Sequence, residues 1–186
     1  MRPLGPTELK RLHRAWQRAS TGRVALLLEN VQTPWNVGAI SRTAAALRVD
    51  HLYLAGTTVA PSHPRAGKTA MGTERYLEWS RHPTVVEAAA AARQDGYTVV
   101  ALELAAGARP IFALELTAGA EVCLALGHED HGLTPACLAL CDRVTFIPQL
   151  GRVGSLNVAV AAAIGVYELR RRQWEALGPG RVDLDP

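Results

Sequence analysis

Residues 147–166 read IPQLGRVGSLNVAVAAAIGV, and this stretch decides the fold. Its first part is a polar loop with two glycines, whereas 158–166 contains only Ala, Val, Ile and Gly. A helix that is apolar on every face must be covered on every side. We expect one side to pack on a sheet and another on a second subunit, so that the protein is a homodimer. Complete burial within a single chain is the alternative.

Upstream of this stretch, apolar runs alternate with segments of helical periodicity. Short apolar runs predict strands at 24–28, 51–55, 97–104, 122–126 and 144–147, with a possible further strand at 76–79. Helical spacing predicts helices at 7–19, 36–47, 83–95, 133–141 and 155–172, and 56–75 is expected to be irregular. Apolar strands that alternate with helices are typical of parallel sheets. The sequence therefore predicts an α/β domain, a mostly parallel sheet with helices on both faces.

Length and composition favour one cytoplasmic domain. The chain has 186 residues, of which 48% are hydrophobic and 20% are charged, and these values exclude disordered and fibrous classes. No apolar run reaches the ~18–20 residues that a membrane span requires, and the first residues do not resemble a signal peptide. The three cysteines lie in apolar surroundings and are expected to be reduced. We expect a basic helical extension at 1–20, the main domain at 21–175 and a flexible tail at 176–186.

Basic residues are concentrated in a few segments of a chain whose formal net charge is +3. Residues 1–23 contain six bases and a single acid, and smaller clusters lie at 65–75 and 170–172. Clustered bases are the footprint of a polyanion-binding surface, with a solvated helix face as the alternative. The candidate contacts to a polyanion are Lys10, Arg11, Arg14, Arg18, Arg65 and Lys68, with Arg75 beside them.

Three polar loops that contain glycine follow directly after predicted strands. They span 29–38, 127–132 and 148–157. In sheets of this class, ligands bind outside the carboxyl ends of the strands. We therefore expect the three loops to meet at one edge of the sheet and to form a single ligand site.

Each loop also contains a motif. Residues 36–42 read NVGAISR, 126–133 read LGHEDHGL and 147–161 read IPQLGRVGSLNVAVA. In this order, the motifs resemble those of the TrmH/SpoU RNA ribose 2′-O-methyltransferases, and the match is closest to the small tRNA-modifying members. The resemblance implies a C-terminal trefoil knot (the SPOUT fold), S-adenosyl-L-methionine as cofactor and a homodimer. It implies RNA as substrate, with tRNA favoured and ribosomal RNA possible.

The resemblance also assigns roles to individual residues. Its catalytic candidates are Arg42, Asn36, Glu129, Ser155 and Asn157, and its cofactor-binding candidates are Leu102, Gly127, Ile147 and Leu156. Helical spacing places Arg42 away from the apolar stripe of its helix, so its side chain points off the core. A guanidinium stays protonated in proteins. We therefore expect Arg42 to hold a phosphate and polarise the ribose 2′-oxygen, with water or the phosphate as proton acceptor.

Several of these residues have a structural interpretation as well. Asn36 could cap the helix that it precedes, and Ser155 could cap the last helix. Glu129 could be a solvated carboxylate, although the resemblance gives it a role in ordering the active-site loops. His128 stands where relatives usually carry a small residue, so its imidazole can crowd or tune the pocket.

Two other classes of function are alternatives to an RNA methyltransferase. A metal-dependent hydrolase would use His128, His131, Cys137 and Cys141, but their spacing is not an established zinc pattern, so no metal is expected. A non-catalytic RNA-binding module would keep the fold and the basic patches alone. The presence of all the catalytic candidates argues against that second alternative.

Overall fold

The computed structural model describes residues 2–20, 22–116 and 120–175. In this part of the chain, seven strands form one sheet in the order β3-β2-β1-β6-β4-β7-β5, and every pairing is parallel. The strands are β1 (Val24–Glu29), β2 (His51–Ala55), β3 (Trp79–His82), β4 (Thr98–Leu102), β5 (Arg109–Pro110), β6 (Val122–Leu126) and β7 (Arg143–Phe146). The predicted α/β class is confirmed. The tail predicted at 176–186 lies outside the described residues.

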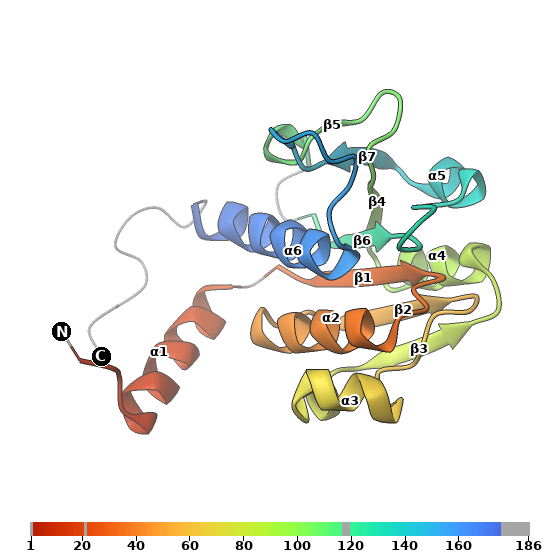
Figure 1. The fold of residues 1–186 in the computed structure, drawn as a ribbon. Helices are drawn as coiled ribbons and strands as arrows, with labels where there is room; N and C mark the ends of the chain where they lie inside the picture. Colours follow the sequence, from red (N-terminus) through yellow and green to blue (C-terminus); the bar gives the residue numbers. More distant parts are fainter. Residues whose placement is uncertain (1, 21, 117–119, 176–186) are drawn as a thin grey trace.

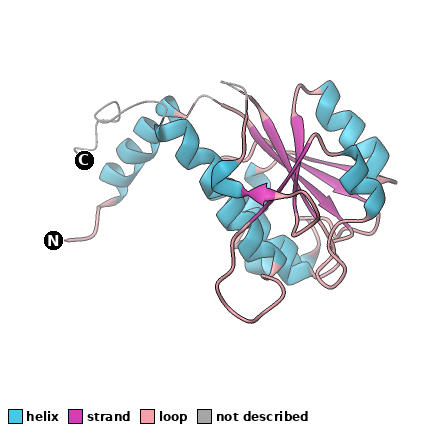
Figure 2. Ribbon diagram, turned by 90° about the horizontal axis from the view of Figure 1, so that it is seen from above, coloured by secondary structure: helices cyan, strands magenta, loops and turns pink. Residues whose placement is uncertain are grey.

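Helices cover both faces of the sheet (Figures 1 and 2). They are α1 (Pro6–Ala19), α2 (Pro34–Ala46), α3 (Pro64–Ala70), α4 (Val85–Gln94), α5 (Pro135–Leu140) and α6 (Val158–Glu175), with 3₁₀ turns η1 (Thr73–Tyr76) and η2 (Ile111–Ala113). One apolar cluster joins the sheet to α2 and α6, and a second joins it to α4 and α5. Because both faces are covered, every residue of β1 and β6 is buried.

Some element boundaries differ from the sequence prediction. Helix α2 begins at Pro34 and not at Asn36. Proline favours the first helical position because its φ angle is already helical, and because the N–H that it lacks would have no partner in the helix at that position. The segment 56–75, predicted to be irregular, contains α3 and most of η1, both too short for a periodic pattern. The third strand is β3 at Trp79–His82 and not 76–79.

Helix α3 packs closely on α2 because Gly38 has no side chain. A Cβ at this position would collide with the backbone carbonyl of Ala66 and with the side chain of Thr69. Gly38 therefore fixes α3, with its exposed bases Arg65 and Lys68, beside the helix that carries Asn36 and Arg42.

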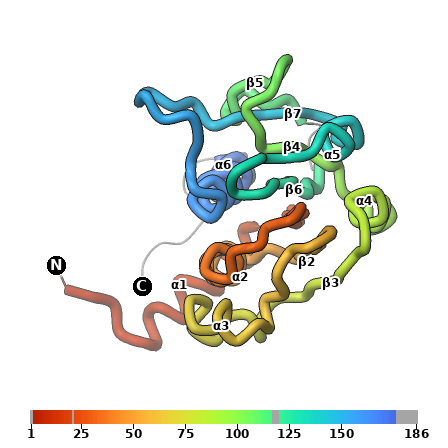
Figure 3. Tube along the Cα trace, turned by 45° about the vertical axis from the view of Figure 1, so that its right-hand side comes forward, coloured from red at the N-terminus to blue at the C-terminus, as the bar shows by residue number. Residues whose placement is uncertain are grey.

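Helix α6 has one buried and one exposed face. Figure 3 shows the chain passing from β7 through a loop into α6, which lies beside α2. Gly165 rests on the sheet, where a Cβ would collide with Leu124. On the opposite side, Val160, Ile164 and Tyr167 are exposed in the single chain. Burial on every side within one chain, the alternative considered above, therefore does not occur.

Arg170 of α6 is buried, with only 2% of its side chain exposed. Its guanidinium donates to the carbonyls of Leu47 (2.9 Å), Gly22 (2.5 Å) and Arg48, and Asp50 lies 3.8 Å away. These contacts tie α6 to the end of α2. Within the basic run 170–172, Arg170 is therefore not available to a polyanion, because it serves the fold.

Helix α1 lies apart from the sheet in Figures 1 and 3 and contains no buried residue. Its contact with the body includes Trp16, whose ring meets that of Trp174 edge to face at 5.0 Å between centroids. No helix in the described ranges is long and apolar enough to cross a membrane.

Candidate active site

Glu129 joins two of the three loops. Its carboxylate accepts hydrogen bonds from the backbone N–H of Gln32 (3.3 Å) and of Thr33 (2.9 Å) and from the Asn36 side chain (3.0 Å). Burial raises the pKa of Glu129, but hydrogen bonds from Asn36 and from the backbone of Glu129 and Thr33 outweigh it and lower the pKa to about 2. The carboxylate is therefore ionised near neutral pH, where it is an acceptor and a poor general base.

Asn157 adds the third loop to this network. Its Nδ2 donates to Asn36 Oδ1 at 3.0 Å, while its Oδ1 accepts the N–H groups of Ala159 (2.9 Å) and Val160 (3.3 Å). Asn157 therefore caps α6 with one end of its amide and orients Asn36 with the other.

Two capping interpretations from the sequence are wrong. Asn36 lies inside the first turn of α2, where Thr33 occupies the cap position, so its amide is directed to Glu129 and Asn157. Ser155 lies before α6, which begins at Val158, and the cap is formed by Asn157. Ser155 is exposed and lines a cavity next to the network.

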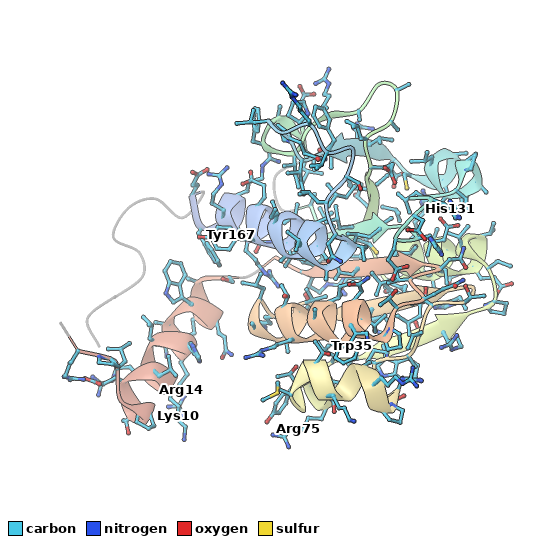
Figure 4. The ribbon with its side chains drawn as sticks, viewed as in Figure 1. Lys10, Arg14, Trp35, Arg75, His131 and Tyr167 are labelled. Atoms are coloured by element: carbon cyan, nitrogen blue, oxygen red, sulfur yellow. The ribbon has the colours of Figure 1, made fainter. Side chains whose placement is uncertain are left out.

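Arg42 is exposed on α2, and its side chain makes no hydrogen bond within the described part of the chain. Trp35, 60% exposed, precedes it by seven residues, which is close to two helical turns. The two side chains therefore share one face of α2, and Figure 4 labels Trp35 at the first turn of that helix. Sequence reasoning did not single out Trp35, although its spacing from Arg42 was a usable signal.

A cavity of about 290 Å³ opens at the carboxyl ends of β4, β6 and β7. All four cofactor candidates, Leu102, Gly127, Ile147 and Leu156, line it. Gly127 lets the loop fold back on itself, because a Cβ there would collide with the backbone of Gly132. His128 and Gly132 then exchange backbone hydrogen bonds of 3.0 and 2.9 Å.

The cavity has the mixed lining that a nucleoside-like cofactor needs. Leucine and isoleucine side chains supply apolar walls, whereas Gln149 Oε1 is buried without a hydrogen-bond partner among the described residues. An orphaned acceptor is costly unless a ligand donor satisfies it. Glu103 also lines the cavity and was missed at the sequence level, although it directly follows Leu102 at a strand end.

The candidate metal ligands do not come together as a metal site. Within the described ranges, no three His, Cys, Asp or Glu side chains form a group that could hold a metal ion. The rings of His128 and His131 stack at 4.9 Å between centroids, and the Cys141 thiol donates to the Cys137 carbonyl at 3.2 Å. His128 lines the cavity, so it does face the predicted pocket.

The basic candidates are exposed on two helices. Lys10, Arg11, Arg14 and Arg18 lie on α1, and Arg65 and Lys68 lie on α3. Figure 4 labels Lys10 and Arg14. A cleft of about 770 Å³ separates α1 from the body, and its walls combine bases such as Arg14 and Arg48 with the aromatic rings of Trp16, Tyr76 and Trp174.

A parallel sheet with a cavity at its strand ends, bordered by a network from three loops, defines a ligand-binding α/β protein. Residues 23–167 match the SpoU rRNA Methylase family, and the chain belongs to this family. It is 35% identical over 163 residues to the tRNA (guanosine(18)-2′-O)-methyltransferase of Thermus thermophilus, covering 88% of this chain and 82% of the relative.

Two further relatives are informative. The 23S rRNA (guanosine-2′-O-)-methyltransferase of Acinetobacter baylyi is 32% identical over 149 residues, which cover 80% of this chain and 59% of the relative. The structure of an AdoMet-bound rRNA methyltransferase from Sinorhizobium meliloti superposes with a TM-score of 0.76 at 29% identity, covering 85% of this chain and 60% of that one. The chain thus spans about three fifths of these two proteins.

Proposed function

We propose that this protein transfers a methyl group from S-adenosylmethionine to a ribose 2′-oxygen of RNA, with tRNA as the favoured substrate and ribosomal RNA as the alternative. The observation that carries the proposal is the network in which Asn36 joins Glu129 and Asn157, each at 3.0 Å, at the edge of the cavity. The relatives act on tRNA or ribosomal RNA by name, which supports this reaction class.

The cavity is the proposed cofactor site. Leu102, Gly127, Ile147 and Leu156 would hold S-adenosylmethionine, and Gln149 would accept one of its donors. The bound cofactor supplies an electrophilic methyl group, and the transfer itself needs no metal.

Arg42 is the proposed catalytic residue. Its guanidinium is exposed and unpaired within the described part of the chain, so it is available to hold a phosphate and to polarise the 2′-oxygen. Glu129, with its pKa near 2, is a poor proton acceptor at neutral pH. We assign it the role of ordering the loops with Asn36 and Asn157, and the proton passes to water or to the phosphate.

The RNA would lie across the face formed by α1, α2 and α3. Four exposed bases on α1 and two on α3 can neutralise phosphates. Trp35, on the same face of α2 as Arg42, offers a ring on which a base can stack. In this proposal the extension at 1–20 captures the RNA and the domain at 21–175 carries out the methyl transfer. We propose a cytoplasmic location for the protein.

Two features of the family are proposed for this chain as well. One is a trefoil knot formed by the segment that includes the 148–157 loop and α6. The other is a homodimer through α6, supported by exposed Val160, Ile164 and Tyr167 on one face.

Ile164→Asp should give monomers or insoluble protein, since a charge cannot be buried there unpaired. Sedimentation should find a wild-type dimer at micromolar concentration, and a stable wild-type monomer would contradict the proposal.

Incubation with methyl-labelled S-adenosylmethionine and either total tRNA or ribosomal RNA tests the function. After digestion to nucleosides, we expect label in 2′-O-methylated nucleosides from tRNA with the wild type and none with Arg42→Ala. Label from ribosomal RNA alone would identify the alternative substrate. RNA binding without any label would indicate a non-catalytic RNA-binding module and overturn the proposal.

A further inference from the structure

The cavity has the opposite charge character to the chain as a whole. The chain contains 20 basic and 17 acidic residues. The cavity walls, however, contain three carboxylates, Glu103, Glu129 and Asp130, and neither Lys nor Arg among the described residues. Because low-dielectric walls focus the field of such charges, a cationic ligand is favoured here over a neutral one of the same shape.

Among these carboxylates, Glu103 is the one that is both partly shielded from solvent and still able to accept further hydrogen bonds. Glu129 is committed to Gln32, Thr33 and Asn36, and Asp130 is exposed to solvent. Glu103 is half-buried and accepts two hydrogen bonds, from Leu104 N at Oε1 (3.0 Å) and from Leu133 N at Oε2 (2.9 Å). A carboxylate has about four acceptor positions, so each of its oxygens keeps one for the cavity.

The Glu103 carboxylate is also held in place before any ligand arrives. It follows directly after β4, and the bond from Leu133 fastens it to the far side of the 127–132 loop. Gly132 has a φ of +66°, and a Cβ at this position would collide with Glu103 Oε2, so the loop backbone rests against the carboxylate. A charge fixed in this way stabilises a ligand without a cost of reorganisation.

We propose that Glu103 makes the cavity distinguish S-adenosylmethionine from S-adenosylhomocysteine by charge. The proposal rests on the proposed function. S-adenosylmethionine carries one positive charge more than the product, because its sulfonium becomes a neutral thioether when the methyl group leaves. A fixed carboxylate therefore attracts the substrate form of the cofactor and loses that attraction after transfer, which favours exchange of the spent cofactor.

Calorimetric titration with each of the two cofactor forms tests the proposal. Glu103→Gln should weaken S-adenosylmethionine binding by about tenfold, the scale of one charge-assisted hydrogen bond. Binding of S-adenosylhomocysteine should change less than threefold, because the Gln carbonyl still accepts the bond from Leu133 N that holds the loop, and only the local bond from Leu104 N is lost. Glu103→Asp, which keeps the charge, should retain part of the preference. Glu78→Gln, which removes the same charge at an exposed position outside the cavity, should alter neither affinity.

If Glu103→Gln loses equal affinity for both ligands, Glu103 only anchors the loop. If both affinities are unchanged, Glu103 does not face the cofactor. Either result overturns the proposal. The wild type gives a second test that does not depend on a variant folding. Its affinity for S-adenosylmethionine should fall more steeply with salt than its affinity for S-adenosylhomocysteine, and identical salt dependence would contradict the charge mechanism. A wild-type protein that binds neither ligand would instead refute the proposed function.

Discussion

At the scale of single residues, Asn36 is the centre of the site. It is 93 positions from Glu129 and 121 from Asn157 in the sequence, yet its amide nitrogen donates to one and its amide oxygen accepts from the other. These bonds fix which end of the amide faces which loop. An Asp in place of Asn36 could not donate to Glu129, so the choice of an amide follows from the network.

Arg42→Ala should lower kcat for methyl transfer by at least about a hundredfold, the loss typical when one preorganised donor is removed from a transition state. Affinity for S-adenosylmethionine should stay within a few-fold, because Arg42 does not line the cavity. Arg42→Lys should also be poorly active, since a point charge does not replace a bidentate fork. Steady-state assays measure kcat and calorimetry measures the affinity for S-adenosylmethionine, and full turnover by Arg42→Ala would remove the residue from the mechanism.

Glu129 should also contribute to stability in a pH-dependent way. Its folded pKa of about 2 lies below the unfolded value of about 4.3. The ionised carboxylate therefore stabilises the fold above about pH 5, and this contribution disappears as the pH falls toward 2. The free energy of unfolding in urea should drop more between pH 6 and pH 3 for the wild type than for Glu129→Gln. Parallel pH profiles for the two proteins would contradict the assignment.

The sequence placed Asn36, Arg42, Glu129 and Asn157 in or just after loops that follow apolar strands, and the resemblance of their motifs to the family made them catalytic candidates. Their partners could not be predicted, since hydrogen bonds between loops depend on how the strands are ordered. Glu103 and Gln149 belong to no periodic pattern. Their significance comes from the cavity that they line, and the cavity exists only in the folded chain.

At the scale of elements, the strands were predictable because parallel strands covered on both faces are apolar along their whole length. The run 122–126 matches β6 at both ends. Helix α3 and strand β5 could not be predicted, because seven and two residues are too few to show a period. Arg170 resembled Arg171 and Arg172 in sequence, and only tertiary packing shows that it is buried whereas they are partly exposed.

Arg170→Met should destabilise the fold by about 3 kcal/mol or more, the typical result of removing one partner from a buried charged network. The carbonyls of Gly22, Leu47 and Arg48 would lose their donor at the junction of α6 with α2. Urea unfolding at fixed protein concentration measures the change. Arg171→Met is the matched control, because Arg171 is far more exposed than Arg170 and forms ion pairs with Glu168 and Glu175 on its own helix, so its loss should matter less. Equal effects of the two substitutions would contradict the role given to Arg170.

At the scale of the whole molecule, the meeting of three loops at one sheet edge was predictable, since parallel strands direct all their carboxyl ends to the same side. The position of α1 was not, because no residue of this helix is buried and its apolar stripe does not specify the surface against which it packs. Charge is the property of α1 that the sequence does define. Its function is therefore best tested through charge, with the helix itself left intact.

Replacement of Lys10, Arg11, Arg14 and Arg18 by Gln should weaken tRNA binding and reduce the slope of log affinity against log salt. Each phosphate contact contributes roughly 0.7–0.9 to that slope, so the loss of four contacts would lower it by about 3. Glutamine is a good helix former, and Trp16 with its contact to Trp174 is retained. Filter binding of tRNA across a salt series measures the slope, and calorimetry should show unchanged affinity for S-adenosylmethionine.

The control for this experiment removes charge from the opposite end of the sheet. Arg109 and Arg143 are exposed on β5 and β7, which lie away from α1 in Figure 1, so their replacement by Gln should leave the slope nearly unchanged. If the α1 variant binds tRNA with wild-type affinity and slope, its bases form only a solvated helix face. The RNA would then be held by other exposed groups, such as Arg65 and Lys68 on α3 and the face of α2 that carries Trp35 and Arg42.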